Sequence, residues 1–240
     1  MTQNRTGRTI GAVGVILPVH DEAELLPGAL QALEPAVDAL STSISSRVAI
    51  VLDDCGDDSS SIARCWAAEF GGLVLHQRCR NVGLARRTGS VALLAGWPEK
   101  DPAQIWLATT DADSRVPEDW LAAQLEAYSS GVDLWAGRVS IDEESATIRR
   151  WTRHYATERS PIHGANLGVS AAVYLQLGGF RGLPSGEDRD LLSRAAGEGF
   201  QIGHDFRAVV TTSSRRHGRA PRGFAGVLEA AEREELEASA

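Results

Sequence analysis

The chain has 240 residues and a formal net charge of −8, with 24 basic against 32 acidic side chains. This acidic balance disfavours a nucleic-acid-binding protein, because such proteins need a basic surface to neutralise phosphates. Hydrophobic residues make up 43% of the chain, which argues against general disorder. No apolar run approaches the roughly 20 residues of a transmembrane segment, and the first nine residues lack the apolar core of a signal peptide. Because the three cysteines form no CxxC pair, we expect reduced thiols in a cytoplasmic protein.

The first half of the chain alternates apolar runs typical of buried strands with helical patterns. The runs predict strands at 11–19, 48–52, 73–75 and 105–109, and helices beginning near Pro27, at a cap of Ser59 or Ser60, at Gly83 and at Pro117. Pro35 lies inside the first helical pattern and predicts a kink or an early stop, since proline has no N–H to donate. This alternation predicts a parallel sheet with helices on both faces.

The pattern changes after residue 130. It predicts strands at 132–139, 165–169 and about 207–212, helices at 144–158, 171–178 and 188–197, and an acidic terminal helix around 229–237. We expect one domain over residues 10–226, with a nucleotide-binding half at about 10–130 and an acceptor half at 131–226. A flexible tail of residues 1–9 would precede it, and an acidic helix or tail of residues 227–240 would follow.

Acidic side chains come directly after three of the predicted strands. The groups are Asp21-Glu22, Asp53-Asp54 and Asp111 with Asp113. In an open parallel sheet, ligands bind just outside the carboxyl ends of the strands, so these groups should meet in one crevice. Gathered carboxylates repel one another, and they are stable only with a cation or a hydrogen-bonding ligand. Asp111 and Asp113 would suit Mg²⁺ or Mn²⁺ bridging to phosphates, although a solvated turn is the alternative.

Several short motifs, in this order, resemble glycosyltransferase family 2, a group of nucleotide-sugar transferases. They are Ile16 to Glu22, Val51 to Ser59, Arg80 to Arg86, Thr110 to Asp113, Gly164 to Gly168, Gly178 to Phe180 and Glu187-Asp188. Each motif is loose, but together they cover roughly residues 12–212. The resemblance implies an α/β fold: a GT-A-like single domain with a Rossmann-like, mostly parallel central sheet and helices on both faces.

The resemblance also implies a donor site. The nucleotide-sugar-binding residues would be Pro18, His20, Glu22, Asp53, Asp54, Arg80, Arg86, Asp111, Ala112, Gly164 and Asn166. The first three would lie against the base and ribose, one carboxylate of Asp53-Asp54 would accept a hydrogen bond from the base, and the two arginines would lie beside the base or diphosphate. Gly164 and Asn166 would line the sugar pocket.

The metal ligands implied by the resemblance are Asp111 and Asp113, with Asp113 as the first choice for direct contact. His217, in the basic stretch from Ser213 to Arg219, would be an additional metal or phosphate contact. Each assignment has a structural alternative. The Asp53-Asp54 pair could cap a helix, the arginines could form surface ion pairs, Glu22 could lie in a solvated loop, residues 164–166 could form a plain turn, and the basic stretch could be an exposed charge run.

The acceptor half would supply the general base. Asp188, or alternatively Glu187, would take the proton from the attacking hydroxyl, because a neutral alcohol is a poor nucleophile. The same carboxylates would also suit the first turn of a helix, where they interact favourably with the helix dipole. The implied reaction transfers a sugar from a UDP- or GDP-sugar to a hydroxyl of a small-molecule or lipid-linked acceptor, with inversion at the anomeric carbon. A homo-oligomer is left open.

Two other functions compete with this interpretation. A nucleotide-sugar-binding protein without transferase activity would keep the donor site, although retention of Asp111, Asp113 and Glu187-Asp188 argues against it. A phosphatase of the haloacid dehalogenase type would use Asp111 as a covalent nucleophile. Such enzymes carry this aspartate after the first strand of the core, whereas three predicted strands precede the strand that leads to Asp111 here.

Overall fold

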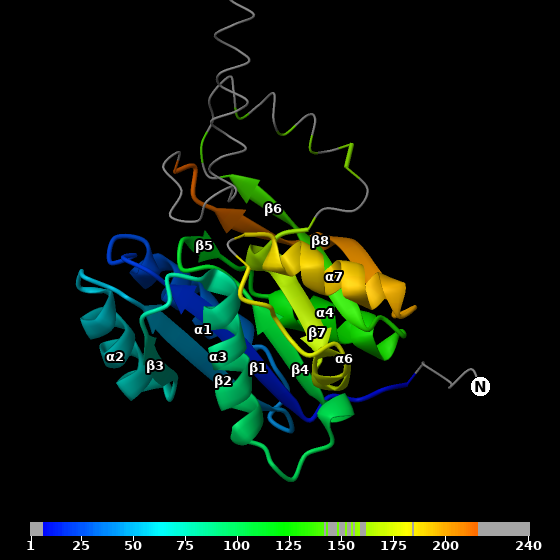
Figure 1. Ribbon diagram of the computed structural model, residues 1–240. Coiled ribbons are helices and arrows are strands. Elements are labelled where there is room, and N and C mark those ends of the chain that lie inside the picture. Colours follow the sequence, from blue (N-terminus) through cyan, green and yellow to red (C-terminus); the bar gives the residue numbers. More distant parts are fainter. Residues whose placement is uncertain are drawn as a thin grey trace, which may run out of the picture.

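The computed structural model describes residues 7–141, 143, 148, 152, 155, 157, 158, 162–183 and 185–215, except for the side chains of residues 205 and 206. One eight-stranded sheet, in the order β3-β2-β1-β4-β7-β6-β8-β5, runs through the molecule (Figure 1). Its strands are β1 (Ala12–Val19), β2 (Ser45–Asp53), β3 (Leu73–Gln77), β4 (Ile105–Thr109), β5 (Ser114–Arg115), β6 (Leu134–Ile141), β7 (Leu167–Ser170) and β8 (Ile202–Thr212). The helices are α1 (Leu26–Asp38), α2 (Ser59–Phe70), α3 (Val82–Ala95), α4 (Trp120–Ser129), α6 (Ala171–Gln176) and α7 (Glu187–Gly197), with short 3-10 turns η1 (Pro102–Gln104) and η2 (Gly164–Asn166).

The sheet has a parallel part and a mixed part. Strands β3, β2, β1 and β4 are parallel neighbours, so their carboxyl ends lie at one edge. Beyond β4, strands β7 and β6 follow in antiparallel pairings, β6 pairs with β8 in parallel, and the short β5 closes the order. The predicted fold class, a mostly parallel sheet with helices on both faces, is confirmed.

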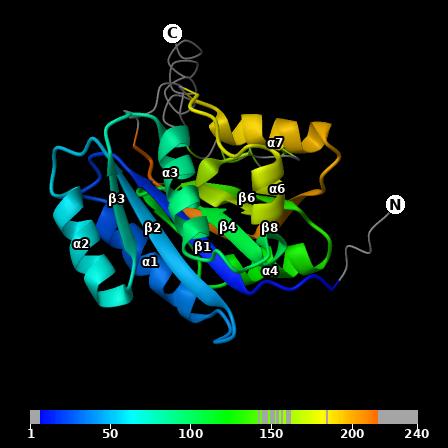
Figure 2. The ribbon, with the colours of Figure 1, turned by 60° about the horizontal axis from the view of Figure 1, so that its bottom comes forward.

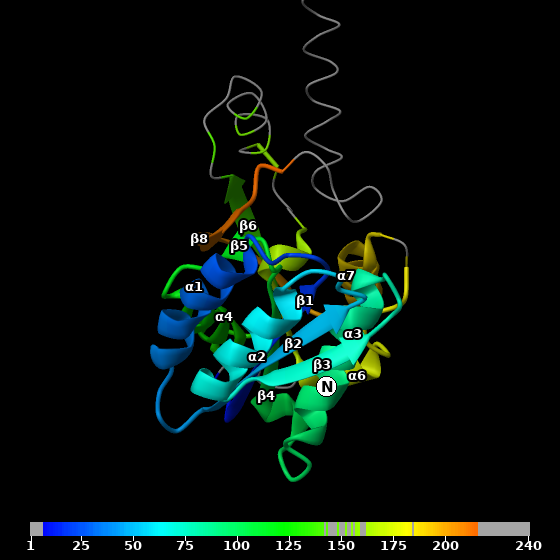
Figure 3. The same ribbon diagram turned by 90° about the vertical axis from the view of Figure 1, so that its left-hand side faces the viewer.

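Two hydrophobic layers cover the two faces of the sheet. Strand β1 is buried on both faces, and its alternate residues point into different layers: Val13 and Leu17 into one, Ile16 into the other. The first layer is completed by α1, α2 and α4, and the second by α3, α6 and α7. Figures 2 and 3 show these two helix groups on opposite sides of the sheet.

Helix α3 packs closely on the sheet because a glycine on each element faces a side chain of the other. A Cβ atom at Gly89 would lie 2.7 Å from Cγ2 of Ile16, and one at Gly14 would lie 2.8 Å from Cδ1 of Leu93. Both distances are too short for a side chain at either position. This close packing positions the first turns of α3 over the carboxyl edge of the parallel strands.

Most element boundaries follow the sequence pattern, with local differences. Helix α1 continues through Pro35 to Asp38 instead of stopping early. Both Pro35 and Gln31, whose carbonyl loses its helical partner, are exposed, so water can supply the missing hydrogen bond. The predicted serine cap of α2 is wrong: Asp58 precedes the helix, and the Ser59 hydroxyl instead accepts from the backbone N–H of Glu22.

The region after β4 also differs from prediction. Strand β5 was not predicted, since two residues carry no periodic signal, and α4 begins at Trp120, three residues after Pro117. The predicted helix at 144–158, the acidic segment 227–240 and the first six residues of the tail lie wholly or mostly outside the described residues.

Candidate active site

The loops that follow β1 and β2 are joined at the carboxyl edge by short hydrogen bonds. The Gly56 backbone N–H donates to Oδ1 of Asp21 at 2.6 Å, and Nδ1 of His20 lies 2.6 Å from the carbonyl oxygen of Asp53. The non-glycine residues with positive φ among those described are Asp21 (52°), Asp54 (57°) and Arg80 (47°), all at this edge. Such backbone costs energy and clusters at functional sites, so the edge is held in a preset shape.

The two aspartates at the end of β2 have different partners. Asp53 accepts the backbone N–H groups of Cys79 (2.7 Å), Arg80 (3.0 Å) and Asn81 (2.8 Å). Burial alone would raise the pKa of the Asp53 carboxyl, but these backbone hydrogen bonds lower it below its usual value. Asp53 therefore anchors the turn that leads into α3. The Asp54 carboxylate accepts fewer hydrogen bonds than that of Asp53. Its Oδ2 accepts from Nε of the exposed Arg80 at 2.7 Å.

A buried ion-pair network, which we name the inner bridge, links Arg86, Asp111 and Glu187. Arg86 on α3 is only 3% exposed, and it donates to Oδ1 of Asp111 at 2.5 Å and to Oε1 of Glu187 in the first turn of α7. Gly164 packs directly against the guanidinium, which would collide with any Cβ at that position. Burial, only partly offset by Arg86, raises the pKa of the Glu187 carboxyl. The inner bridge thus ties the end of β4 to the helix of the predicted base.

A second network, the outer bridge, links Arg215, Glu22 and Asp113. Arg215 donates to both carboxylate oxygens of Glu22, at 2.7 and 2.9 Å, and to Oδ2 of Asp113 at 3.2 Å. Burial, followed by the negative charges of Asp111 and Glu22, raises the pKa of Asp113 to about 6, although Arg215 opposes the shift. The site therefore holds more negative charge than its arginines neutralise.

This donor set fits a hard divalent cation. Asp111 and Asp113 have partly exposed side chains, at 34% and 21%, and offer carboxylate oxygens at the mouth of the site. A further group, in which Asp21, Cys55 and Asp57 offer ligand atoms within 4.8 Å of one another, lies nearby. Its aspartate oxygens already accept backbone N–H groups, and burial raises the pKa of the Cys55 thiol, which favours the protonated form. The aspartates after β4 are the better metal candidates.

The edge also carries Asp188 and His163. Asp188 is partly exposed in the first turn of α7, and its Oδ1 accepts the backbone N–H of Arg189 at 2.7 Å. Burial lowers the pKa of His163 to about 4, so its imidazole is neutral at pH 7, within electrostatic range of Asp188. Of the two base candidates, Glu187 is buried and paired with Arg86, whereas Asp188 is partly exposed to solvent.

The remaining predicted site residues have varied surroundings. Pro18 is partly exposed near the end of β1, and Ala112 is buried between the two candidate metal ligands. Asn166 is wholly buried; its side chain accepts from Trp120 and Trp135 and donates to two backbone carbonyls. We therefore do not retain Asn166 as a donor-contacting residue. His217 lies outside the described residues.

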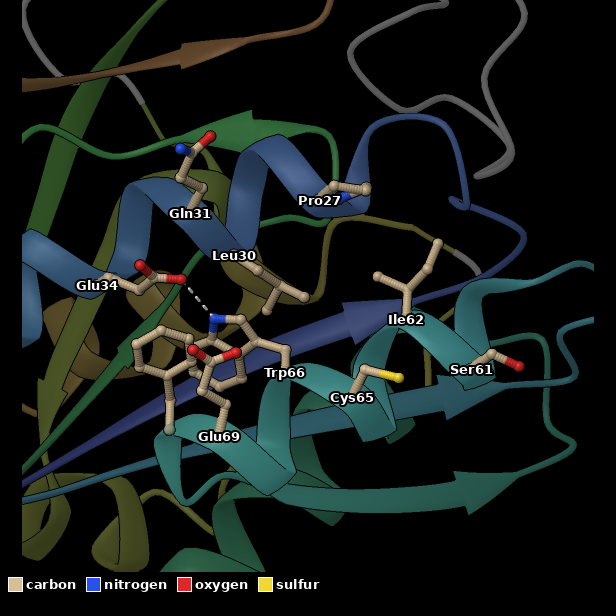
Figure 4. Close-up of a pocket in the computed structure, with 10 residues that line it drawn as sticks. Pro27, Leu30, Gln31, Glu34, Ser61, Ile62, Cys65, Trp66 and Glu69 are labelled. Atoms are coloured by element: carbon tan, nitrogen blue, oxygen red, sulfur yellow. Dashed lines mark hydrogen bonds between the residues drawn. The ribbon is translucent and has the colours of Figure 1, made fainter.

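An apolar groove of about 450 Å³ lies between α1 and α2. It is lined by Pro27, Leu30, Gln31, Glu34, Ser61, Ile62, Cys65, Trp66, Glu69 and Phe70. The indole N–H of Trp66 donates to Glu34 at 2.9 Å, and this hydrogen bond is the dashed line in Figure 4. None of these ten residues is basic. The groove therefore lacks the cations that a diphosphate needs, and the charged carboxyl edge is the better candidate for a donor site.

Comparisons with known proteins support the fold and identify the family. A family model described as glycosyl transferase family 2 matches residues 14–180, more than half of the chain. The chain belongs to this family. The match confirms the predicted family, and it covers the candidate donor residues from β1 to η2. No curated protein sequence matches the chain.

Solved structures with a similar fold include glycosyltransferases, two of them in complex with GDP-Man or UDP. S. aureus TarS is 11% identical with a TM-score of 0.63, over 84% of this chain and 36% of that one. The mannosyltransferase PcManGT from Pyrobaculum calidifontis, in complex with GDP-Man and Mn²⁺, is 19% identical with a TM-score of 0.66, over 96% of this chain and 71% of that one. GalNAc-T7 with UDP, GalNAc and Mn²⁺ is 11% identical with a TM-score of 0.65, over 88% and 46%. At these identities the likeness shows the fold alone, and the chain spans about a third of TarS and under half of GalNAc-T7.

Within the part of the chain that the structure describes, no helix is both long enough and apolar enough to cross a membrane.

The sequence interpretation did not single out Arg215 as a site residue. In the sequence it is one of several cations in the stretch from Ser213 to Arg219. The available signal is its position, because Arg215 lies shortly after the last strand in a basic stretch of an acidic protein. The hydrogen bonds between Arg215 and Glu22 join residues 193 positions apart, and local sequence patterns do not predict such a pairing.

Proposed function

We propose that this protein transfers a sugar from a nucleoside diphosphate sugar to a hydroxyl acceptor, with a divalent cation, Asp188 as general base and inversion at the anomeric carbon. The observation that carries the proposal is the gathering of Glu22, Asp111 and Asp113 at the carboxyl edge of parallel strands, beside Asp188. The complexes of the similar structures with GDP-Man, UDP and Mn²⁺ support the donor class and the metal.

The donor half of the site would bind the nucleotide and the diphosphate. Asp54 is the better candidate for the base, since Asp53 already accepts three backbone N–H groups. Arg80, exposed and adjacent to Asp54, would reach the base or a phosphate oxygen. Asp113, with Asp111, would hold the divalent ion, and that ion would act as a Lewis acid for the leaving diphosphate.

The acceptor half would activate the hydroxyl. Asp188 would accept the hydroxyl proton through its free carboxylate oxygen, while the backbone N–H of Arg189 holds the other oxygen in place. Glu187, bound to Arg86, would fix the first turn of α7 and so orient its neighbour. We infer a small-molecule or lipid-linked hydroxyl as the acceptor class.

Release of nucleoside diphosphate from a panel of UDP- and GDP-sugars, with Mn²⁺, Mg²⁺ or chelator, tests the reaction. We expect turnover with at least one donor and loss of it on chelation. Thermal shift with the same panel measures binding separately, because a ligand that binds only the folded state raises its melting temperature. Donor binding without turnover of any donor, with acceptor fractions supplied, would favour a binding protein.

Replacing Asp188 by Asn tests the base. The variant should retain the thermal shift caused by donor and Mn²⁺ but lose about 10²–10⁴-fold in transfer rate. Glu198→Gln, at the exposed opposite end of α7, is the matched control and should transfer at the wild-type rate. Comparable rates in Asp188→Asn and the control would remove Asp188 from the mechanism.

A further inference from the structure

We propose that Glu22 and Asp113 form a cation subsite of the donor site that Arg215 fills in the donor-free protein and yields to the divalent ion. The inference rests on the proposed function, since it concerns the metal expected there. It adds Glu22 to the residues that attract the ion, and it makes Arg215 a competitor of the ion.

The geometry of Arg215 resembles that of a bound cation. Its guanidinium contacts both oxygens of Glu22 and one oxygen of Asp113, and therefore joins the loop after β1 to the loop after β4. Glu22 is 7% exposed, and its backbone N–H is held by Ser59. A carboxylate that is almost buried and fixed at its backbone needs a positive partner at this place. A divalent ion and a guanidinium are alternative ways to meet that need.

The attachment of Arg215 allows an exchange. The Ser213 backbone N–H donates to the carbonyl oxygen of Asp113 at 3.1 Å, and Thr212 pairs with Ser114 at the end of β8. The chain is thus anchored beside Asp113, and in the proposed exchange the Arg215 side chain rotates away while this backbone stays in place. By contrast, Arg86 lies inside α3 and is 3% exposed, so its side chain cannot rotate into solvent in the same way.

Occupation by Arg215 should reduce the apparent affinity for the ion. If the ion binds only to molecules in which Arg215 has moved away, only that fraction of the protein is competent to bind it. The apparent dissociation constant of the ion is then higher than the intrinsic one. Removal of the guanidinium should therefore strengthen Mn²⁺ binding, whereas removal of the Glu22 charge should weaken it.

Direct measurement of Mn²⁺ binding without donor, by the electron paramagnetic resonance signal of free Mn²⁺, tests the exchange. We expect Arg215→Gln to bind Mn²⁺ roughly tenfold more tightly than wild type, and Glu22→Gln to bind it more weakly. Arg207→Gln removes a cation from β8, the strand that precedes Arg215 in the chain. Arg207 pairs with Glu126 at the surface, and its loss should leave the affinity unchanged.

Arg215→Lys separates competition from the general effect of a positive charge. Lysine keeps the charge but cannot contact both Glu22 oxygens as the planar guanidinium does, so exchange predicts tighter Mn²⁺ binding than in wild type. Affinities of Arg215→Gln and Arg215→Lys equal to or weaker than that of wild type would overturn the inference while leaving the metal in place. Absence of Mn²⁺ binding in all variants, with nucleoside diphosphate added, would overturn the metal role and this inference together.

Discussion

The inner and the outer bridge contain the same chemical groups, one arginine between two carboxylates, yet they are built differently. Arg86 comes from the middle of a helix packed against the sheet, and its partners stand at the end of β4 and in the first turn of α7. Arg215 comes from the chain after the last strand, and its guanidinium is partly exposed. The position of each arginine in the fold decides whether its ion pairs are permanent or exchangeable.

The difference has an energetic consequence. In the inner bridge, loss of one partner leaves a charge in the core, where it cannot be solvated. In the outer bridge, water and a ligand cation can replace the arginine, so its ion pairs add less to stability. The comparison therefore predicts opposite responses when each network is altered.

Replacing Arg86 by Met should give the largest effect. Glu187, which is 4% exposed, would lose its positive partner, and we expect a loss of about 3–5 kcal/mol in the free energy of unfolding. Urea denaturation measures the change. The neighbouring Arg87 is exposed, and Arg87→Met should change stability by no more than about 0.5 kcal/mol.

The double variant Arg86→Met/Glu187→Gln sharpens this test. It removes the orphaned charge and should recover part of the lost stability, because the buried carboxylate rather than the missing contact causes most of the cost. If Arg86→Met were as stable as Arg87→Met, the inner bridge would have no structural role.

Substitution of Gly164 by Ala tests the packing around the inner bridge. The new methyl group would collide with the Arg86 guanidinium, and the displacement should cost about 1–3 kcal/mol. Gly197 at the end of α7 has open space around it, so Gly197→Ala should be neutral or stabilising by about 0.4–1 kcal/mol. Thermal unfolding of the pair measures the contrast, and equal melting temperatures would contradict it.

Much of the fold could be predicted from the sequence because its signals are local. The apolar run of β1 and the alternation of strands with helices give the parallel part of the sheet and its layers. Pairings in the second half, such as β6 with β8 around a shift in register between Gly137 and Val139, depend on contacts between distant segments. The two-residue β5 has too few residues for any periodic signal.

The candidate site was predictable in place but not in detail. The rule that ligands bind at carboxyl ends of parallel strands located Asp111 and Asp113 correctly at the edge. The rule does not predict that the Asp53 carboxylate accepts backbone N–H groups of the turn at residues 79–81. Nor does it predict that tryptophan side chains donate to Asn166. Both outcomes depend on what else packs nearby, and a residue type alone does not specify it.

Asp113→Asn should separate the two networks by changing stability in the opposite direction. The pKa of Asp113 is raised to about 6 from its usual value of 3.8. Above pH 6 the folded protein therefore carries a charged carboxylate in surroundings that favour the protonated acid, and this lowers the free energy of unfolding. Removing that charge should stabilise the protein at pH 7.5 by about 1–2 kcal/mol, allowing for solvent screening at a partly exposed side chain. As pH falls through 6 toward 4, wild-type Asp113 becomes protonated and the difference should shrink.

Urea denaturation of Asp113→Asn and wild type at pH 7.5 and pH 5 checks both the sign and the pH dependence. Glu99 is exposed to solvent, so Glu99→Gln should show no such gain at either pH. A variant that gains stability while losing Mn²⁺ binding would mean that Asp113 is kept charged for its ligand and against the stability of the fold. If Asp113→Asn were instead less stable at pH 7.5, the ion pair with Arg215 would outweigh the repulsion, and the outer bridge would be structural like the inner one.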